Sequence, residues 1–378
     1  MKTEIINPFI TGGYLSPEYF CNRTSETKRI VSAISSKRNM TLISLRRMGK
    51  TGLLKHIKYQ LENAKRPVAV IYADLLPTMN GNEMLNAVSS ALYRISKSEK
   101  NFLEKIFSFM ASLRPRLTMD PLTGEPSVEL KVESDSGIKS GLEQILRLIS
   151  EIKQGIVFML DEFQQIGNYP EKNIEAVLRS VIQTYPDVPF IFSGSSKHML
   201  ENMFMSPGKP FYQSSELLYL DRIGGDDYRN FIKEKFSQGH MVIADPLIDK
   251  VLNWTRHHTY YVQYVCNHLY EKGENKISDE QVNDVFHRII TDFEPQYINY
   301  RNLLPAHQYR LIKAIAVEDG VSQPTSGNFI AKHDLTSPSS VSTSLKALAE
   351  KEMITNDLNK WNVYDVFFSR WLEYHYKE

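Results

Sequence analysis

The sequence predicts an α/β protein with a mainly parallel sheet, followed by a helical region and a small unit of helices and a hairpin. Three observations lead to this prediction. Over roughly the first 220 residues, short runs rich in Val, Ile, Leu and Phe alternate with segments of helical periodicity. These runs are nearly uninterrupted, as expected for strands buried on both faces. After Arg222 the sequence becomes helical and rich in Tyr and His, and after residue 300 its pattern changes again.

In the first part, each expected strand is an apolar run that ends at polar or turn residues. The five runs are 41–44, 68–72, 155–160, 188–192 and 216–220. Good helix formers fill the intervening segments 51–64, 82–96, 141–153 and 171–185. One stretch, near 114–132, breaks the alternation because it holds two β-like segments around the turn DPLTG. We expect an inserted hairpin there.

The 378 residues are expected to form two or three domains. The predicted boundaries give a core, a helical unit and a winged helix over 1–222, 223–300 and 301–378. The last assignment rests on three helices followed by two β segments, at 306–317, 328–333, 338–350, 353–356 and 361–364. Three helices and a hairpin is the winged-helix order. Ser337 and Pro338 suit the N-cap and first turn of the third helix.

Composition excludes several classes of protein. Lys and Arg number 45 against 44 Asp and Glu, so no field over the whole molecule attracts nucleic acid or anionic lipid. Cys21 and Cys266 have no CxxC or Cys/His spacing, which argues against a disulfide framework or structural zinc. The opening residues lack a signal-peptide pattern, and no run approaches the roughly 18 apolar residues of a membrane span. We therefore expect a cytoplasmic protein with no membrane partner.

A phosphate-binding loop is predicted directly after the first strand. Residues 44–51 read SLRRMGKT and match the P-loop pattern GxxxxGK[ST], except that serine replaces the first glycine. Main-chain N–H groups of such a loop surround phosphate oxygens, and the helix N-terminus adds its positive end. Lys50 is expected to neutralise phosphate, and Thr51 to offer its hydroxyl to Mg²⁺. The predicted nucleotide-binding residues here are Ser44, Arg46, Arg47, Met48, Gly49, Lys50, Thr51 and Gly52.

Two later strands end in polar side chains. One ends in Asp161 and Glu162, and the other continues into Ser193 and Ser195. Ligands bind where parallel strands end, so Asp161 is expected to hold Mg²⁺ through water and Glu162 to polarise an attacking water. The predicted catalytic residues are therefore Glu162 and Lys50. One of the serines is expected to sense the γ-phosphate or, alternatively, to cap the next helix.

Five segments carry a resemblance to a known family: NPFITGGYLSPEYFCNRTSET, SLRRMGKTGLL, FMLDEFQQI, FIFSGSSKHML and NVYDVFFSRWL. Over residues 8–372 the chain resembles the archaeal-type P-loop ATPases of archaea and Bacteroides-like bacteria, which are AAA-like and related to the signal-transduction ATPases with numerous domains. The resemblance implies an ATPase core, a helical lid and a C-terminal winged helix, with ATP between core and lid. It also implies that Arg23, in the box FxxRxxE, flanks the nucleotide; the alternative is a surface charge.

The chain departs from this family's pattern at three places. Ser44 takes a positive φ less readily than glycine, so the loop geometry is in question. No arginine lies between Arg179 and Arg222, where relatives often carry a glycine-arginine pair suited to an arginine finger; we therefore expect slow or partner-dependent turnover. Residues 257–261 read HHTYY where relatives often read Gly-x-Pro-Tyr-Tyr, and this segment begins with the pair His257 and His258. Lacking a carboxylate or cysteine at useful spacing, they are expected to pack rather than bind metal.

The winged helix lacks the basic character of a DNA reader. Residues 301–378 contain nine Lys and Arg and nine Asp and Glu, so their net charge is zero. DNA affinity rests largely on neutralising phosphates, and the third helix offers only Lys346 and Lys351 with acids close by. We therefore favour a structural or regulatory winged helix over DNA binding.

Three hypotheses about function follow. The leading one is an ATP-binding, Mg²⁺-dependent ATPase that works as a nucleotide-controlled switch, with a protein partner or self-association as further candidates. The second is a DNA-binding winged-helix regulator with a nucleotide-sensing domain. The third, motivated by Ser44 and the missing arginine, is a scaffold that binds nucleotide without hydrolysing it. The lack of a guanine-type motif favours ATP over GTP only mildly.

Overall fold

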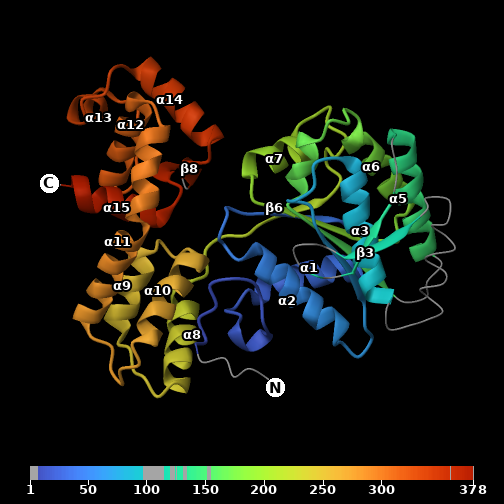
Figure 1. The fold of residues 1–378 in the computed structure, drawn as a ribbon, viewed down its shortest axis with the longest axis horizontal. Coiled ribbons are helices and arrows are strands. Elements are labelled where there is room, and N and C mark those ends of the chain that lie inside the picture. Colours follow the sequence, from blue (N-terminus) through green and yellow to red (C-terminus); the bar gives the residue numbers. More distant parts are fainter. Residues whose placement is uncertain are drawn as a thin grey trace. The chain divides into compact units, whose positions relative to one another are not determined.

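The computed structural model describes residues 7–96, 115–119, 124, 126–130, 134–150, 155–357 and 359–377. Within them the chain divides into two compact units (Figure 1), one over residues 12–222 and one formed by residues 7–11 with 223–377. The predicted boundaries between core, lid and winged helix remain predictions. The predicted hairpin turn at 120–123 and the predicted helix end at 151–153 lie outside the described residues.

The first unit is built on a five-stranded parallel sheet with the order β2-β5-β6-β1-β7, so the predicted fold class is confirmed. Its strands are β1 (Met40–Ile43), β2 (Ala69–Asp74), β5 (Ile156–Asp161), β6 (Phe190–Gly194) and β7 (Glu216–Tyr219). The two strands with carboxylate or serine ends, β5 and β6, lie side by side in the middle of the sheet. Their carboxyl ends therefore meet at one edge.

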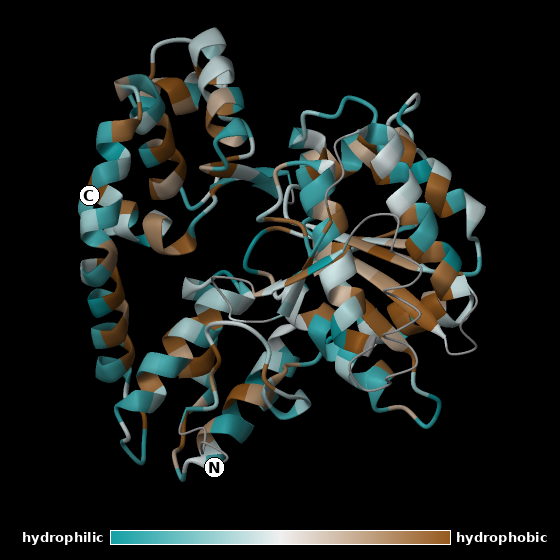
Figure 2. Cartoon of the chain, turned by 45° about the vertical axis from the view of Figure 1, so that its right-hand side comes forward, coloured by the Kyte–Doolittle hydropathy of each residue, from teal (hydrophilic) through white to brown (hydrophobic). Residues whose placement is uncertain are grey.

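Helices cover both faces of this sheet, because alternate strand residues are apolar on each face. One buried cluster joins α1 (Thr24–Ser35) and α2 (Lys50–Glu62) to the sheet. The other joins the opposite face to α3 (Gly81–Ser96), α5 (Asp135–Ser150), α6 (Ile174–Thr184) and α7 (Lys197–Met205). The 3-10 helices are η1 (Pro17–Tyr19) and η3 (Phe163–Asn168). Figure 2 shows the strands in the brown of apolar residues between these helices.

A short antiparallel hairpin stands apart from the sheet. It consists of β3 (Arg116–Met119) and β4 (Pro126–Glu129). The hairpin is attached to α3, because Ser90 Oγ accepts a hydrogen bond of 2.9 Å from the amide of Val128, whose side chain is buried. β3 itself is exposed along its length.

The second unit is helical and ends in a winged helix. Its first helices are α8 (Gly225–Gln238), α9 (Asp245–Trp254), α10 (Thr259–Glu271) and α11 (Asp279–Leu303). The winged helix follows as α12 (Ala306–Val317), α13 (Gly327–Lys332), α14 (Pro338–Glu350), β8 (Ile354–Asp357), β9 (Lys360–Val363) and α15 (Val366–Tyr376). The predicted N-cap is confirmed, since Ser337 Oγ accepts from the Ser340 amide. No described helix is long and apolar enough to cross a membrane.

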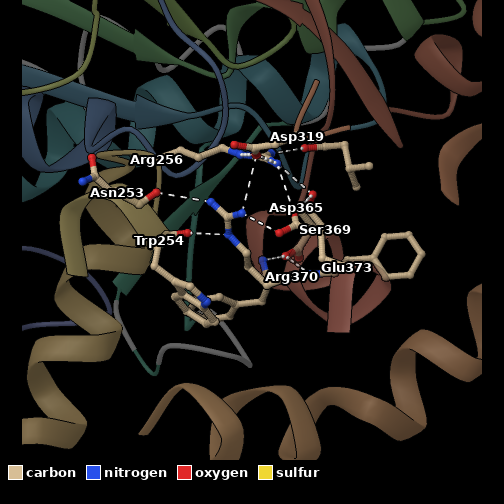
Figure 3. Close-up of polar contacts among 11 residues, drawn as sticks. Asn253, Trp254, Arg256, Asp319, Asp365, Ser369, Arg370 and Glu373 are labelled. Carbon is tan, nitrogen blue, oxygen red and sulfur yellow. Dashed lines mark hydrogen bonds and ion pairs between the residues drawn. The ribbon is translucent and has the colours of Figure 1, made fainter. Parts of the chain in front are cut away.

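A partly buried cluster of arginines and carboxylates, here called the arginine cluster, joins the end of α9 to the winged helix (Figure 3); its Asp319 is exposed. Arg256 forms an ion pair of 2.7 Å with Asp319 and one of 3.6 Å with Glu373. Arg370 pairs with the same two carboxylates and donates to the carbonyl oxygen of Trp254 at 2.9 Å. Beside it, the Trp254 ring packs at 5.5 Å from the ring of Phe367. Polar and apolar contacts thus join the two parts of this unit.

Candidate nucleotide-binding site

The predicted phosphate loop connects β1 to α2, as the sequence motif requires. Gly49, with φ 89°, is the N-cap of α2, and Arg47 is also left-handed, with φ 66°. Ser44 is not left-handed; its amide continues the sheet by donating to the carbonyl oxygen of Gly194 at 3.5 Å. The backbone at this position therefore does not require the glycine that the motif usually has there.

The other loop residues divide between surface and core. Arg46 and Arg47 are exposed, whereas Met48 is buried among the apolar residues of α1 and α2. Gly52 lies in the first turn of α2. A Cβ atom added at Gly52 would lie 3.6 Å from the ring of Phe20. A larger residue at Gly52 would thus contact that ring.

Asp161 lies at the centre of the site and is almost fully buried. Its Oδ2 accepts from Thr51 Oγ1 at 2.8 Å, and its Oδ1 lies 3.3 Å from Lys50 Nζ. Ser193 Oγ also donates to Oδ1. Burial alone raises the pKa of the Asp161 carboxyl, but Lys50 and the hydrogen bonds from Ser193, Thr51 and Tyr72 outweigh it, so the pKa lies below its ordinary value. Asp161 is therefore held ionised.

Glu162 follows β5 in a left-handed conformation, with φ 53°. Such conformations are strained for residues other than glycine and cluster at functional sites. Lys50 Nζ donates to its Oε1 at 2.8 Å, while Ser195 Oγ and Gln164 Nε2 donate to its Oε2 at 2.8 and 2.6 Å. Burial opposes ionisation, but Lys50, Gln164 and Ser195 lower the pKa of Glu162 below its ordinary value. Both carboxylates thus converge on one ammonium group.

The two predicted serines contact these carboxylates. Ser193 donates to Asp161 and Ser195 to Glu162. The helix that follows, α7, has Ser196 as its N-cap residue, and no side-chain cap hydrogen bond forms there. Between the serines, Gly194 leaves no room for a side chain, because a Cβ atom would lie 1.9 Å from Gln164 Oε1. The turn after β6 therefore packs closely against Gln164 and contacts Glu162 through Ser195.

Arg23 is buried, which contradicts the alternative of a surface charge. Its guanidinium donates to the carbonyl oxygen of Asp221 at 2.6 Å and to that of Met48 at 3.2 Å, and it forms an ion pair with Glu26 at 2.9 Å. These contacts link the residue before α1 to the phosphate loop and to the segment after β7. Arg23 thus stabilises the phosphate loop by connecting it to the segment after β7.

Sequence reasoning missed three polar residues of this site. Tyr72 donates to Asp161 Oδ2 at 3.0 Å, Gln164 donates to Glu162, and Asp74 lies opposite Asp161 in the register of β2 and β5. Burial and the nearby Asp161 and Glu162 raise the pKa of Asp74. A signal was present, because β2 is parallel to β5 and its carboxyl end reaches the same edge. To recognise this signal, one must know that β2 and β5 are neighbours in the sheet, and the local sequence does not show this.

The donor set fits magnesium bound together with a nucleotide. A hydroxyl and a carboxylate oxygen, on Thr51 and Asp161, lie 2.8 Å apart, and Mg²⁺ prefers oxygen ligands. Among the described residues no group of three or more His, Cys, Asp and Glu side chains could hold a metal ion. Magnesium in such sites typically takes one or two protein ligands and completes its shell with phosphates and water.

Comparison with known proteins agrees with this architecture. Residues 295–374 match a family model described as a probable winged helix domain. None of the curated proteins matches the chain. Among solved structures, the chain is similar to the Walker-type ATPase PABY2304 of Pyrococcus abyssi, with a TM-score of 0.67, 14% identity, and coverage of 97% of this chain and 99% of that one.

The ORC1 and ORC2 proteins of Aeropyrum pernix are also similar in structure. The ORC2 protein, solved in ADPNP and ADP complexes, has a TM-score of 0.59 and 14% identity and covers 97% of this chain and 95% of its own. The ORC1 protein, solved in complex with DNA, has a TM-score of 0.51 and 14% identity, with coverage of 95% and 94%. At this level of identity the likeness shows the fold: a P-loop ATPase core followed by a winged helix.

Proposed function

We propose that this protein binds ATP with Mg²⁺, hydrolyses it, and works as a nucleotide-controlled switch. The observation that carries the proposal is the convergence of Lys50, Thr51, Asp161 and Glu162 at the carboxyl edge of one parallel sheet. They come from the start of α2 and the end of β5, elements 110 residues apart in sequence. A positive helix end, an ammonium group and two ionised carboxylates are the groups that phosphoryl transfer needs.

Each residue has a defined task in this proposal. Lys50, which now faces Asp161 and Glu162, exchanges these contacts for the phosphate oxygens of ATP. Thr51 and Asp161 hold Mg²⁺, which offsets the charge of the phosphates. Glu162, kept ionised and oriented by Ser195 and Gln164, accepts the proton of the attacking water. Ser193 and Ser195 report the presence of the γ-phosphate through the carboxylates that they contact.

The switch itself is a proposal about the whole chain. Because the site includes residues of the loop and of two strand ends, nucleotide binding must rearrange the contacts of Lys50 and both carboxylates. We infer that residues 223–300 act as a lid and 301–378 as a regulatory winged helix, as in the archaeal-type ATPases that the chain resembles. The missing arginine between 179 and 222 predicts that a protein partner or a second copy accelerates turnover.

The test measures ATP binding and phosphate release for the wild type, Lys50→Ala and Glu162→Gln. We expect Lys50→Ala to lose nucleotide affinity, because the ammonium group is the cation of the site. We expect Glu162→Gln to keep affinity and to release phosphate about 100-fold more slowly, as expected when a general base is removed. Unchanged binding in Lys50→Ala removes the loop assignment, and unchanged phosphate release in Glu162→Gln removes the role of Glu162.

Two other functions keep specific support. DNA binding is favoured by the winged helix and by the likeness to an ORC1 protein solved with DNA, but the zero net charge of 301–378 opposes it. A salt-dependent shift of duplex DNA by the full chain would support it, and no shift at low salt would remove it. The non-hydrolysing scaffold loses one of its two motives, since Ser44 is unstrained. Bound nucleotide that persists without turnover would favour that scaffold.

A further inference from the structure

The hydroxyl of Tyr72 contacts the same carboxylate oxygen as Thr51. Tyr72 lies on β2, the edge strand of the sheet, and its partly buried ring packs against the cluster formed by α1 and α2. Its hydroxyl lies 3.0 Å from Asp161 Oδ2, and Thr51 Oγ1 lies 2.8 Å from that oxygen. Two donors from different elements therefore meet at one oxygen atom.

The remaining donors act on the other oxygen of Asp161. Lys50 Nζ, Ser193 Oγ and the Glu162 amide, the last at 3.0 Å, all contact Oδ1. The two oxygens are therefore distinguished: Oδ1 faces the ammonium, and Oδ2 faces the hydroxyl of Thr51. A carboxylate free to rotate about its last bond would exchange these positions. The donors on Oδ1 and Thr51 already restrain this rotation, and Tyr72 adds a donor to Oδ2 from a strand outside the phosphate-loop helix.

We propose that Tyr72 is a positioning residue that aims Asp161 Oδ2 at Thr51 and so sets the affinity of the site for Mg²⁺ in the presence of nucleotide. The inference rests on the proposed function. It assigns a role to a residue that belongs to none of the sequence motifs of the site. Groups that orient the ligands of a metal typically change its affinity about 10-fold to 100-fold when they are removed.

The test uses Tyr72→Phe in the full chain, which keeps the ring and removes the hydroxyl. Binding of a fluorescent ATP analogue is measured in EDTA and over a series of Mg²⁺ concentrations. We expect unchanged affinity in EDTA and an increase of about tenfold in the Mg²⁺ concentration that gives half of the magnesium effect. The matched control is Tyr185→Phe, whose hydroxyl donates to the carbonyl oxygen of Glu143 at 3.2 Å away from the site. It should behave as wild type.

A second variant separates positioning from packing. In an Asp161→Asn background, Tyr72→Phe should cause no further change in the magnesium dependence, because the carboxylate that it orients is gone. The inference is overturned if Tyr72→Phe keeps the wild-type magnesium dependence, or if it weakens binding equally in EDTA and in Mg²⁺. Wild-type protein that binds no nucleotide overturns the proposed function as well, whereas normal wild-type binding with an unaffected Tyr72→Phe overturns this inference alone.

Discussion

Two charge clusters of the described residues, the candidate nucleotide site and the partly buried arginine cluster, differ in their cations and surroundings. In the candidate nucleotide site, one flexible lysine, Lys50, faces two carboxylates, Asp161 and Glu162. In the arginine cluster, two guanidinium groups face the two carboxylates of Asp319 and Glu373. The single positive charge of Lys50 neutralises only one of its two carboxylates. In the arginine cluster, two positive charges face two negative charges. The first arrangement suits the entry of a further cation, and the second does not.

The two clusters also differ in how firmly their cations are held. Arg370 also donates to the backbone carbonyl oxygens of Trp254 and Asn253, so its planar group is fixed by the main chain. Lys50 ends in a compact ammonium on a flexible stem, which can leave its carboxylates for phosphate. We conclude that burial and ion pairing alone do not identify a functional site. The position of its charges at the ends of parallel strands is the reason why we propose a function for the first cluster and not for the second.

The largest expected effect concerns Arg370→Ala in the arginine cluster. Removing the guanidinium leaves Asp319, Glu373 and two carbonyl oxygens with fewer donors, although Arg256 still pairs with both carboxylates. The free energy of unfolding should therefore fall by about 3 kcal/mol, the upper range for hydrogen bonds to charged groups. Urea unfolding monitors this change. ATP affinity, measured on the folded protein, should stay at its wild-type value. A loss of ATP affinity with unchanged stability would reverse the roles that we assign to the clusters.

Two buried serines allow a matched comparison between the clusters. Ser369 Oγ accepts from Arg256 at 2.8 Å, and Ser195 Oγ donates to Glu162 at 2.8 Å. Ser369→Ala should lower the free energy of unfolding by about 1.5 kcal/mol, the lower range for a hydrogen bond to a charged group, and leave phosphate release unchanged. Ser195→Ala should slow phosphate release roughly tenfold, because Glu162 loses a positioning contact. Equal effects of both variants on both measurements would contradict the distinction.

The pH dependence of stability tests the charge of the nucleotide site. The pKa values of Asp161 and Glu162 are lowered on folding, so both contribute stability above their ordinary values of 3.8 and 4.5 and lose it as the pH falls. In Lys50→Met the cation that lowers both is absent. The acid-side fall in unfolding free energy should then begin at a higher pH than in the wild type. Identical pH profiles for Lys50→Met and wild type would exclude this coupling.

The smallest effect on the free energy of unfolding is expected for an exposed ion pair, which serves as the reference for the arginine cluster. Arg288 and Asp292 form an exposed ion pair of 3.5 Å along α11, in the same unit as Arg370. Exposed pairs contribute little, so Arg288→Ala should change the free energy of unfolding by less than about 0.5 kcal/mol. The same urea experiment measures it. A loss comparable to that of Arg370→Ala would mean that burial is not the source of the difference.

Contiguous motifs made the centre of the site predictable. Lys50 and Thr51 stand next to a strand and a helix in sequence, and Asp161 and Glu162 end an apolar run, so local patterns identified all four. Tyr72 was missed because its role depends on which strands are neighbours. Gln164 is only two residues from Glu162 and was missed because the sequence does not show that its side chain turns back toward that carboxylate. The question about the loop geometry at Ser44 could not be answered from the sequence, which does not fix which loop residue takes a positive φ; Arg47 and Gly49 do so here.

The arginine cluster lay beyond sequence reasoning altogether. Arg256 is separated from Asp319 by 63 residues and from Ser369 by 113, and nothing in the local sequence pairs these charges. The first three helices and the two strands of the winged helix were predicted closely, because their boundaries carry local signals such as the Ser337 N-cap, whereas the final helix α15 was not predicted. Local structure was thus predictable, whereas long-range charge pairing was not.

The most direct test of the central claim is a calorimetric titration of the full chain with ATP and Mg²⁺. Wild-type protein should bind ATP at one site, and Lys50→Ala should bind at least about 30-fold more weakly, as expected when one partner of a buried charge contact is removed. Lys58→Ala, in the same helix but in an ion pair with Glu62 at the surface, should bind as wild type does. No heat of binding with wild-type protein, or equal affinity of Lys50→Ala and wild type, would contradict the account.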